Sequence, residues 1–96
     1  MAVLFSNNAA SNLSASITST ATSLSVAAGT GAEFPNPTGS DYFYATLSDA
    51  AGSIEIIKVT ARSADTMTVV RGQDGTTARA WANSDKIELR LTAAGL

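Results

Sequence analysis

The side chains that could do chemistry in this 96-residue chain are carboxylates and hydroxyls, because it contains neither His nor Cys. The commonest general base and metal ligand is therefore missing, and so are thiolate sites and disulfides. Each Asp falls in a predicted loop, where Asp side chains ordinarily bond to local backbone N–H groups. We therefore expect structural carboxylates, no enzyme activity, no metal and no cofactor. The loop residues are Asp41, Asp49, Asp65, Asp74 and Asp85.

Two further constellations fall short of known catalytic or ligand motifs. Neither Lys58 nor Lys86 follows a Ser by three residues, as Ser–Lys chemistry needs. The stretch 71–75, Arg-Gly-Gln-Asp-Gly, has glycines like a phosphate loop and an Asp like a calcium loop. It lacks the Walker lysine and the regular acidic ladder of a calcium site, so we expect no small-molecule ligand there.

The aromatic residues leave two interpretations open. Trp81 lies close to Arg79, and together with Tyr42 and Tyr44 it could form a stacking platform for a sugar. This would make the chain a small carbohydrate-binding module. In the other interpretation Trp81 covers one end of the core. Six basic against eight acidic residues argue against nucleic-acid binding in either case.

The elements that must position these residues are predicted to be strands, giving an all-β fold. Leu13, Ala15 and Ile17 alternate with polar residues, as do Leu24 and Val26, which predicts a hairpin. A loop over 29–40 follows, with Phe34 as its anchor. Short turns separate the later apolar runs, which favours a small antiparallel barrel or sandwich of about six strands. The later strands are predicted at 41–48, 54–61, 66–71 and 86–92.

One short helical turn is predicted over Ala78–Ala82, with Thr76 or Thr77 as its cap. Gly72 and Gly75 bracket a tight loop just before it, so we expect at least one of them at positive φ. The side chain of Arg71 is predicted to bond to the carbonyls of this loop.

The apolar content predicts a thin core. Of the 43 hydrophobic residues 18 are Ala, which leaves 25 larger side chains for a single domain over residues 1–96. A domain of this size buries little surface, and no disulfide supports it. We therefore expect its stability to depend on association, with copies of itself or with partner proteins.

The first third of the chain suits such association, because no charged residue occurs before Glu33. Residues 1–12 are predicted to form an N-terminal arm in which Val3, Leu4 and Phe5 make an apolar cluster. Two placements stay open: an edge strand of its own sheet, or a groove of a neighbouring subunit by β-augmentation. The start has neither a secretory signal nor a membrane span, so we expect a protein made and retained in a cytoplasm, or in something assembled there, without membrane contact.

The stretch 55–81 contains a recognisable pattern. It runs Glu-Ile-Ile-Lys-Val-Thr at 55–60, then Thr-Met-Thr-Val-Val-Arg-Gly-Gln-Asp-Gly-Thr-Thr-Ala at 66–78, followed by Trp81. This run resembles a module of virion structural proteins of tailed bacteriophages, often found at the N-terminus of tail-fibre and tail-associated proteins. The family commonly has Leu where Met67 stands, and often Gly-Asp where this chain has Asn83-Ser84-Asp85.

The resemblance implies a non-enzymatic virion protein, assembled in a bacterial host. It implies a tail adaptor or short-fibre subunit, or alternatively a head decoration protein, whose partners are other virion proteins and copies of itself. The chain ends at Leu96, just after the last predicted strand, so the resemblance does not extend to receptor recognition. The residues predicted to bind a partner are Val3, Leu4, Phe5, Arg71, Gln73 and Trp81.

Overall fold

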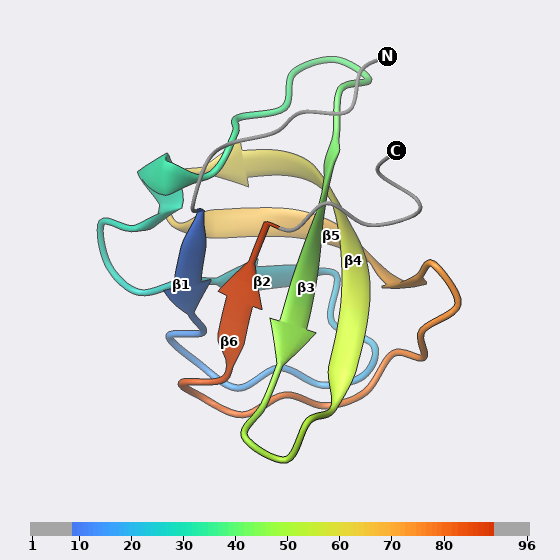
Figure 1. Ribbon diagram of the computed structural model, residues 1–96. Coiled ribbons are helices and arrows are strands. Elements are labelled where there is room, and N and C mark those ends of the chain that lie inside the picture. The colour runs from blue at the N-terminus through green and yellow to red at the C-terminus, as the bar shows by residue number, and fades with distance from the viewer. Residues whose placement is uncertain (1–8, 90–96) are drawn as a thin grey trace.

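One curled antiparallel sheet of six strands makes up the fold in the computed structural model, which describes residues 9–89 (Figure 1). The strands lie side by side in the order β1-β6-β3-β4-β5-β2. The predicted all-β class with six strands is confirmed. The strands are β1 (Ala10–Asn12), β2 (Ser23–Ser25), β3 (Phe43–Ser48), β4 (Ile54–Ser63), β5 (Thr66–Gln73) and β6 (Lys86–Glu88).

The two long strands in the middle bend the sheet. β4 and β5 pair with two register shifts, between Ile56 and Lys58 and between Val59 and Ala61. Such irregularities bend a strand and increase its twist. The sheet therefore curls into a half-barrel, and its two edge strands meet at a single antiparallel bridge between Leu13 and Val26.

The predicted N-terminal hairpin is correct only at its base. Ser14 donates to the Ser25 carbonyl at 2.9 Å beside the Leu13–Val26 bridge. The flanking strands then separate, because β1 pairs with β6 while β2 pairs with β5. Each segment thus buries its apolar side chain along a different edge of the sheet, which a flat two-stranded hairpin cannot do.

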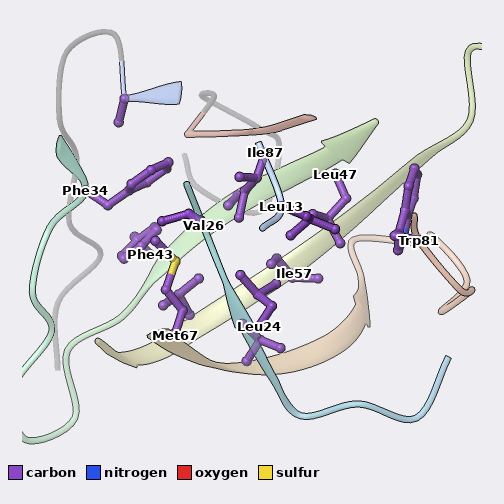
Figure 2. Close-up of a cluster of buried hydrophobic side chains, with 14 residues drawn as sticks. Leu13, Leu24, Val26, Phe34, Phe43, Leu47, Ile57, Met67, Trp81 and Ile87 are labelled. Atoms are coloured by element: carbon purple, nitrogen blue, oxygen red, sulfur yellow. The ribbon is translucent and has the colours of Figure 1, made fainter. Parts of the chain in front are cut away.

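The core lies on the concave side of the sheet and follows the period of two. In β3, Phe43, Ala45 and Leu47 are fully buried. Phe34 is also buried and stacks on Phe43 with ring centroids 6.1 Å apart, which confirms its predicted role as the loop anchor. Figure 2 shows Phe34 and Phe43 at one end of this cluster and Trp81 at the other.

The helical turn predicted at Ala78–Ala82 is wrong. The only helical element in residues 9–89 is a 3-10 turn, η1, at Gly31–Glu33. Trp81 instead forms an isolated antiparallel bridge with Ile17, and each donates its N–H to the other's carbonyl, at 2.9 and 3.0 Å. A single turn gains little from helix propensity, so these tertiary bonds decide the conformation.

Only residues 9–12 of the predicted N-terminal arm lie within the described part of the chain. Ala9 is buried, and the following residues form β1, which pairs with β6 of the same sheet. The edge-strand placement is therefore correct for residues 10–12. Val3, Leu4 and Phe5 lie outside the described residues, so their predicted partner contact stays a prediction.

Candidate functional site

A buried carboxylate is the most unusual feature of this small domain. Glu55 is the second residue of β4 and has no exposed surface, on the same face as the buried Ile57 and Val59. Its two oxygens accept five hydrogen bonds of 2.8 to 3.2 Å, although a carboxylate offers only about four lone-pair positions. The donors are Arg71 Nε and Nη2, the backbone N–H groups of Gly72 and Arg79, and Trp81 Nε1.

Arg71 is equally saturated, since all five of its guanidinium N–H groups have a partner. Two donate to Glu55 in a bidentate pair, and the Arg71 side chain is only 8% exposed. The other three donate to backbone carbonyls at 2.6 to 3.0 Å. Arg71 therefore bonds to loop carbonyls as predicted, but none of them lies in the loop at 72–75. The carbonyls belong to Thr18, Ala21 and Arg79.

We call the group Glu55, Arg71, Gly72, Arg79 and Trp81 the Glu55–Arg71 centre. Burial of Glu55 raises its pKa, but the hydrogen bonds of the centre, led by that from Arg71, outweigh burial and hold the pKa below its ordinary value. The carboxylate is therefore ionised at neutral pH. With every lone pair and every guanidinium proton engaged, the pair ties the loop at 18–21 to the connection between β5 and β6 and has no group left to bind a ligand.

The local backbone after β5 makes this geometry possible. Gly72 has a φ of 60° and Gly75 a φ of 80°, which confirms the expected positive φ. A Cβ on Gly72 would lie 3.2 Å from the Thr76 carbonyl, so the turn closes tightly there. The Thr76 hydroxyl donates to the Gln73 carbonyl at 2.6 Å and accepts the Ile56 N–H at 2.9 Å, which ties the loop back to β4.

An open groove of about 540 Å³ lies over the centre, and we call it the Trp81 groove. Arg79 crosses it, with its guanidinium 4.3 Å from the centre of the Trp81 ring and an ion pair of 2.9 Å to Asp49. The hydrogen bond from Arg79, with that from the Ser53 N–H, lowers the pKa of Asp49. The groove is lined by Ser16, Ile17, Thr18, Asp49, Arg79, Ala80, Trp81, Ala82 and Asp85.

Three of the loop Asp residues have the structural role expected of them. Asp49 accepts the N–H groups of Ala51 and Ser53 across its turn, and Asp85 accepts that of Ala82. Asp65 accepts the N–H groups of Gly29 and Gly31, which fastens the segment before η1 to the β4–β5 turn.

The structure does not bring the predicted sugar platform together. Trp81 is only 2% exposed, with its indole N–H given to Glu55, so its ring has no open face for a sugar. Tyr42 and Tyr44 contact each other edge to face at 5.6 Å, and Lys58 lies 4.5 Å from the centre of the Tyr42 ring. Trp81 and the two tyrosines are thus separate features.

Three of the residues predicted to bind a partner can be located. Arg71 and Trp81 belong to the Glu55–Arg71 centre, and Trp81 covers a core end as one interpretation of the sequence required. The side chain of Gln73 donates to the Arg71 carbonyl at 3.1 Å and is half-buried. Their contacts are thus internal to the domain, and partner binding through them stays a prediction.

Reasoning from the sequence missed the role of Glu55. The signal was present, because Glu55 has the same parity along β4 as Ile57 and Val59, both of which are fully buried. A charged residue on the inward face of a strand needs a charged partner.

No group of three or more His, Cys, Asp or Glu side chains in residues 9–89 is placed to hold a metal ion. In the same residues, no helix is long and apolar enough to cross a membrane. Comparison with known protein families and with curated proteins finds no match to this chain.

Proposed function

We propose that this chain is a non-enzymatic structural subunit of a tailed-bacteriophage virion, part of the tail as an adaptor or short-fibre subunit. It acts by protein–protein assembly, with copies of itself and with other virion proteins. The observation that carries the proposal is the Glu55–Arg71 centre. All of its residues come from the segment that resembles the virion module, and together they fix the loops around the core end.

This arrangement explains why such a segment would recur in virion proteins. Glycine, arginine and carboxylate in a fixed spacing often mark a ligand site, but here their polar groups bond to one another. A module whose most distinctive residues hold the fold together is suited to serve as a rigid building block. The assembly surfaces are then its exposed faces, such as the one presenting Ile54 and Val70, which are 50% and 45% exposed.

The test is to locate the chain in particles. Particles of the phage that encodes it are purified, tails are separated from tail-less heads, and both fractions are analysed by mass spectrometry. Parallel fractions from uninfected host cells serve as the control for carry-over. We expect the chain in the tail fraction. Its presence in heads alone would make it a head decoration protein, and its absence from particles would overturn the proposal.

A further inference from the structure

The Trp81 groove has two walls that come from distant parts of the sequence. One is the segment 16–18 and the other is the segment 79–82, joined by the paired backbone bonds of Ile17 and Trp81. Arg71 holds both walls from beneath, through the carbonyls of Thr18 and Arg79. The groove is therefore formed before anything enters it, which lowers the entropic cost of binding.

The walls suit an extended peptide. Ser16, Ala80 and Ala82 have small side chains and are exposed, so a second backbone can approach closely. Next to a hydrogen-bonded antiparallel pair, the N–H and C=O groups of the flanking residues point away from the pair. Ser16 and Ala80 therefore present these groups at opposite edges of the Ile17–Trp81 pair, and neither has a backbone partner among the described residues. An incoming chain can pair with the edge at Ala80.

The charges of the groove favour an uncharged occupant with amide side chains. Arg79 and Asp49 already neutralise each other. Within residues 9–89, Arg79 Nε and Nη2 and Asp85 Oδ1 have no hydrogen-bond partner, since Asp85 uses only Oδ2 on the Ala82 N–H. A side-chain amide offers both a donor and an acceptor, which matches this pair of open groups.

Residues 1–8 of this chain have that chemistry. They read Met-Ala-Val-Leu-Phe-Ser-Asn-Asn, an apolar cluster followed by two amides, with no charged side chain. The described chain begins at Ala9, whose carbonyl accepts the Leu89 N–H. This is one end of β1, whereas Asp85 of the groove bonds to Leu13 at the other end (Figure 1).

We propose that residues 1–8 of one copy bind in the Trp81 groove of the next copy. An extended segment of eight residues spans about 26 Å. Because segment and groove belong to opposite ends of β1, copies stacked end to end bring them together without the segment folding back. Such a head-to-tail contact produces a ring or a filament. The inference rests on the assembly role proposed above.

The absence of Cys allows a direct test with the full chain. One single-cysteine variant carries Leu4→Cys and a second, of different mass through a tag, carries Ala80→Cys. The two are mixed and oxidised, and the mixed disulfide is quantified on a non-reducing gel. Leu4→Cys with Ala28→Cys is the matched control, because Ala28 is an exposed alanine outside the groove. Circular dichroism checks that every variant folds.

We expect the Leu4–Ala80 heterodimer in several-fold excess over the control pair, and we expect a synthetic peptide of residues 1–8 to suppress it. An excess no greater than the control, or no suppression by the peptide, would overturn the proposal. A double variant that forms only an intrachain bond would overturn it as well, and would place the segment in its own groove. The test uses purified protein, so it can succeed or fail independently of the virion experiment.

Discussion

The Glu55 carboxylate and the Arg71 guanidinium meet side by side, with Nε and Nη2 donating to the two carboxylate oxygens at 2.8 and 2.9 Å. Both side chains are shielded from solvent. Removing one partner of a buried ion pair leaves the other charge buried without compensation, which lowers the free energy of unfolding by about 3–5 kcal/mol.

Replacing Glu55 by Gln should lower the free energy of unfolding by about 3–5 kcal/mol, because the Arg71 charge stays buried without its partner. Urea unfolding followed by Trp fluorescence measures the change. Asp74→Asn is the matched control, since Asp74 is an exposed acidic residue and Asn tolerates its positive φ of 52°. Equal stability of the Glu55 variant and the control would contradict a stabilising role for the pair.

The stability of the protein should fall in acid. The folded state holds the pKa of Glu55 below its ordinary value of 4.5, so the unfolded chain takes up this proton first. The contribution is complete above that value and is lost as the pH falls below it toward the lower, folded-state pKa. Asp65, whose pKa is lowered mainly by the N–H groups of Gly29 and Gly31, adds to the slope.

Urea unfolding at a series of pH values tests this dependence. Glu55→Gln should show a shallower fall than the natural chain, while the slope from Asp65 remains. Parallel curves for the two proteins would mean that Glu55 does not contribute to the acid sensitivity.

Two substitutions of Trp81 should distinguish the contribution of its packing to stability from the contribution of its hydrogen bond. Trp81→Phe keeps an aromatic ring but removes the N–H that reaches Glu55, and we expect a cost of about 1–3 kcal/mol. Trp81→Ala also leaves a cavity at the core end, and we expect about 3–5 kcal/mol. Because both remove the fluorophore, unfolding is followed by far-ultraviolet circular dichroism. A Trp81→Ala variant of normal stability that fails to assemble would make Trp81 an interface anchor instead.

The two glycines of the loop should differ in their tolerance of a side chain. Both have positive φ, so Ala is strained at either position by about 1–2 kcal/mol. Gly72→Ala also crowds the Thr76 carbonyl, whereas a Cβ on Gly75 meets no atom of residues 9–89 within 4 Å. Thermal unfolding should therefore rank Gly72→Ala below Gly75→Ala. The reverse order would contradict the tight closure of this turn.

Association should contribute to stability. With 18 of its hydrophobic residues being Ala, the chain has few large side chains for an independent core. Binding that favours the folded state raises the unfolding temperature as protein concentration increases. Differential scanning fluorimetry over a wide concentration range measures this shift. Deletion of residues 2–8 should reduce it, and a monomer whose unfolding temperature is independent of concentration would contradict it.

Local patterns in the sequence determined the three longest strands and the alternation of buried and exposed side chains along them. The predicted strands at 41–48, 54–61 and 66–71 agree with β3, β4 and β5 within two residues at each end. Phe34 was identified as the loop anchor, and Asp49 and Asp65 as loop-stabilising residues. These features follow from the period of two and from the chemistry of turns, which act over a few residues.

The tertiary structure alone decided which segments pair and what surrounds Glu55. The segment 13–17 was expected to pair with 24–26, but only the bridge between Leu13 and Val26 forms. β1, just before that segment, lies against β6, some 75 residues further along the chain. The bonds that hold Glu55 join it to residues 16 and 26 positions away, and no local period encodes them. Backbone bonds between Trp81 and Ile17, which lie further apart still in the sequence, likewise replaced the predicted helical turn. A buried charge is tolerated only where the fold places hydrogen-bond partners around it. The role of Glu55 therefore depends on the tertiary structure.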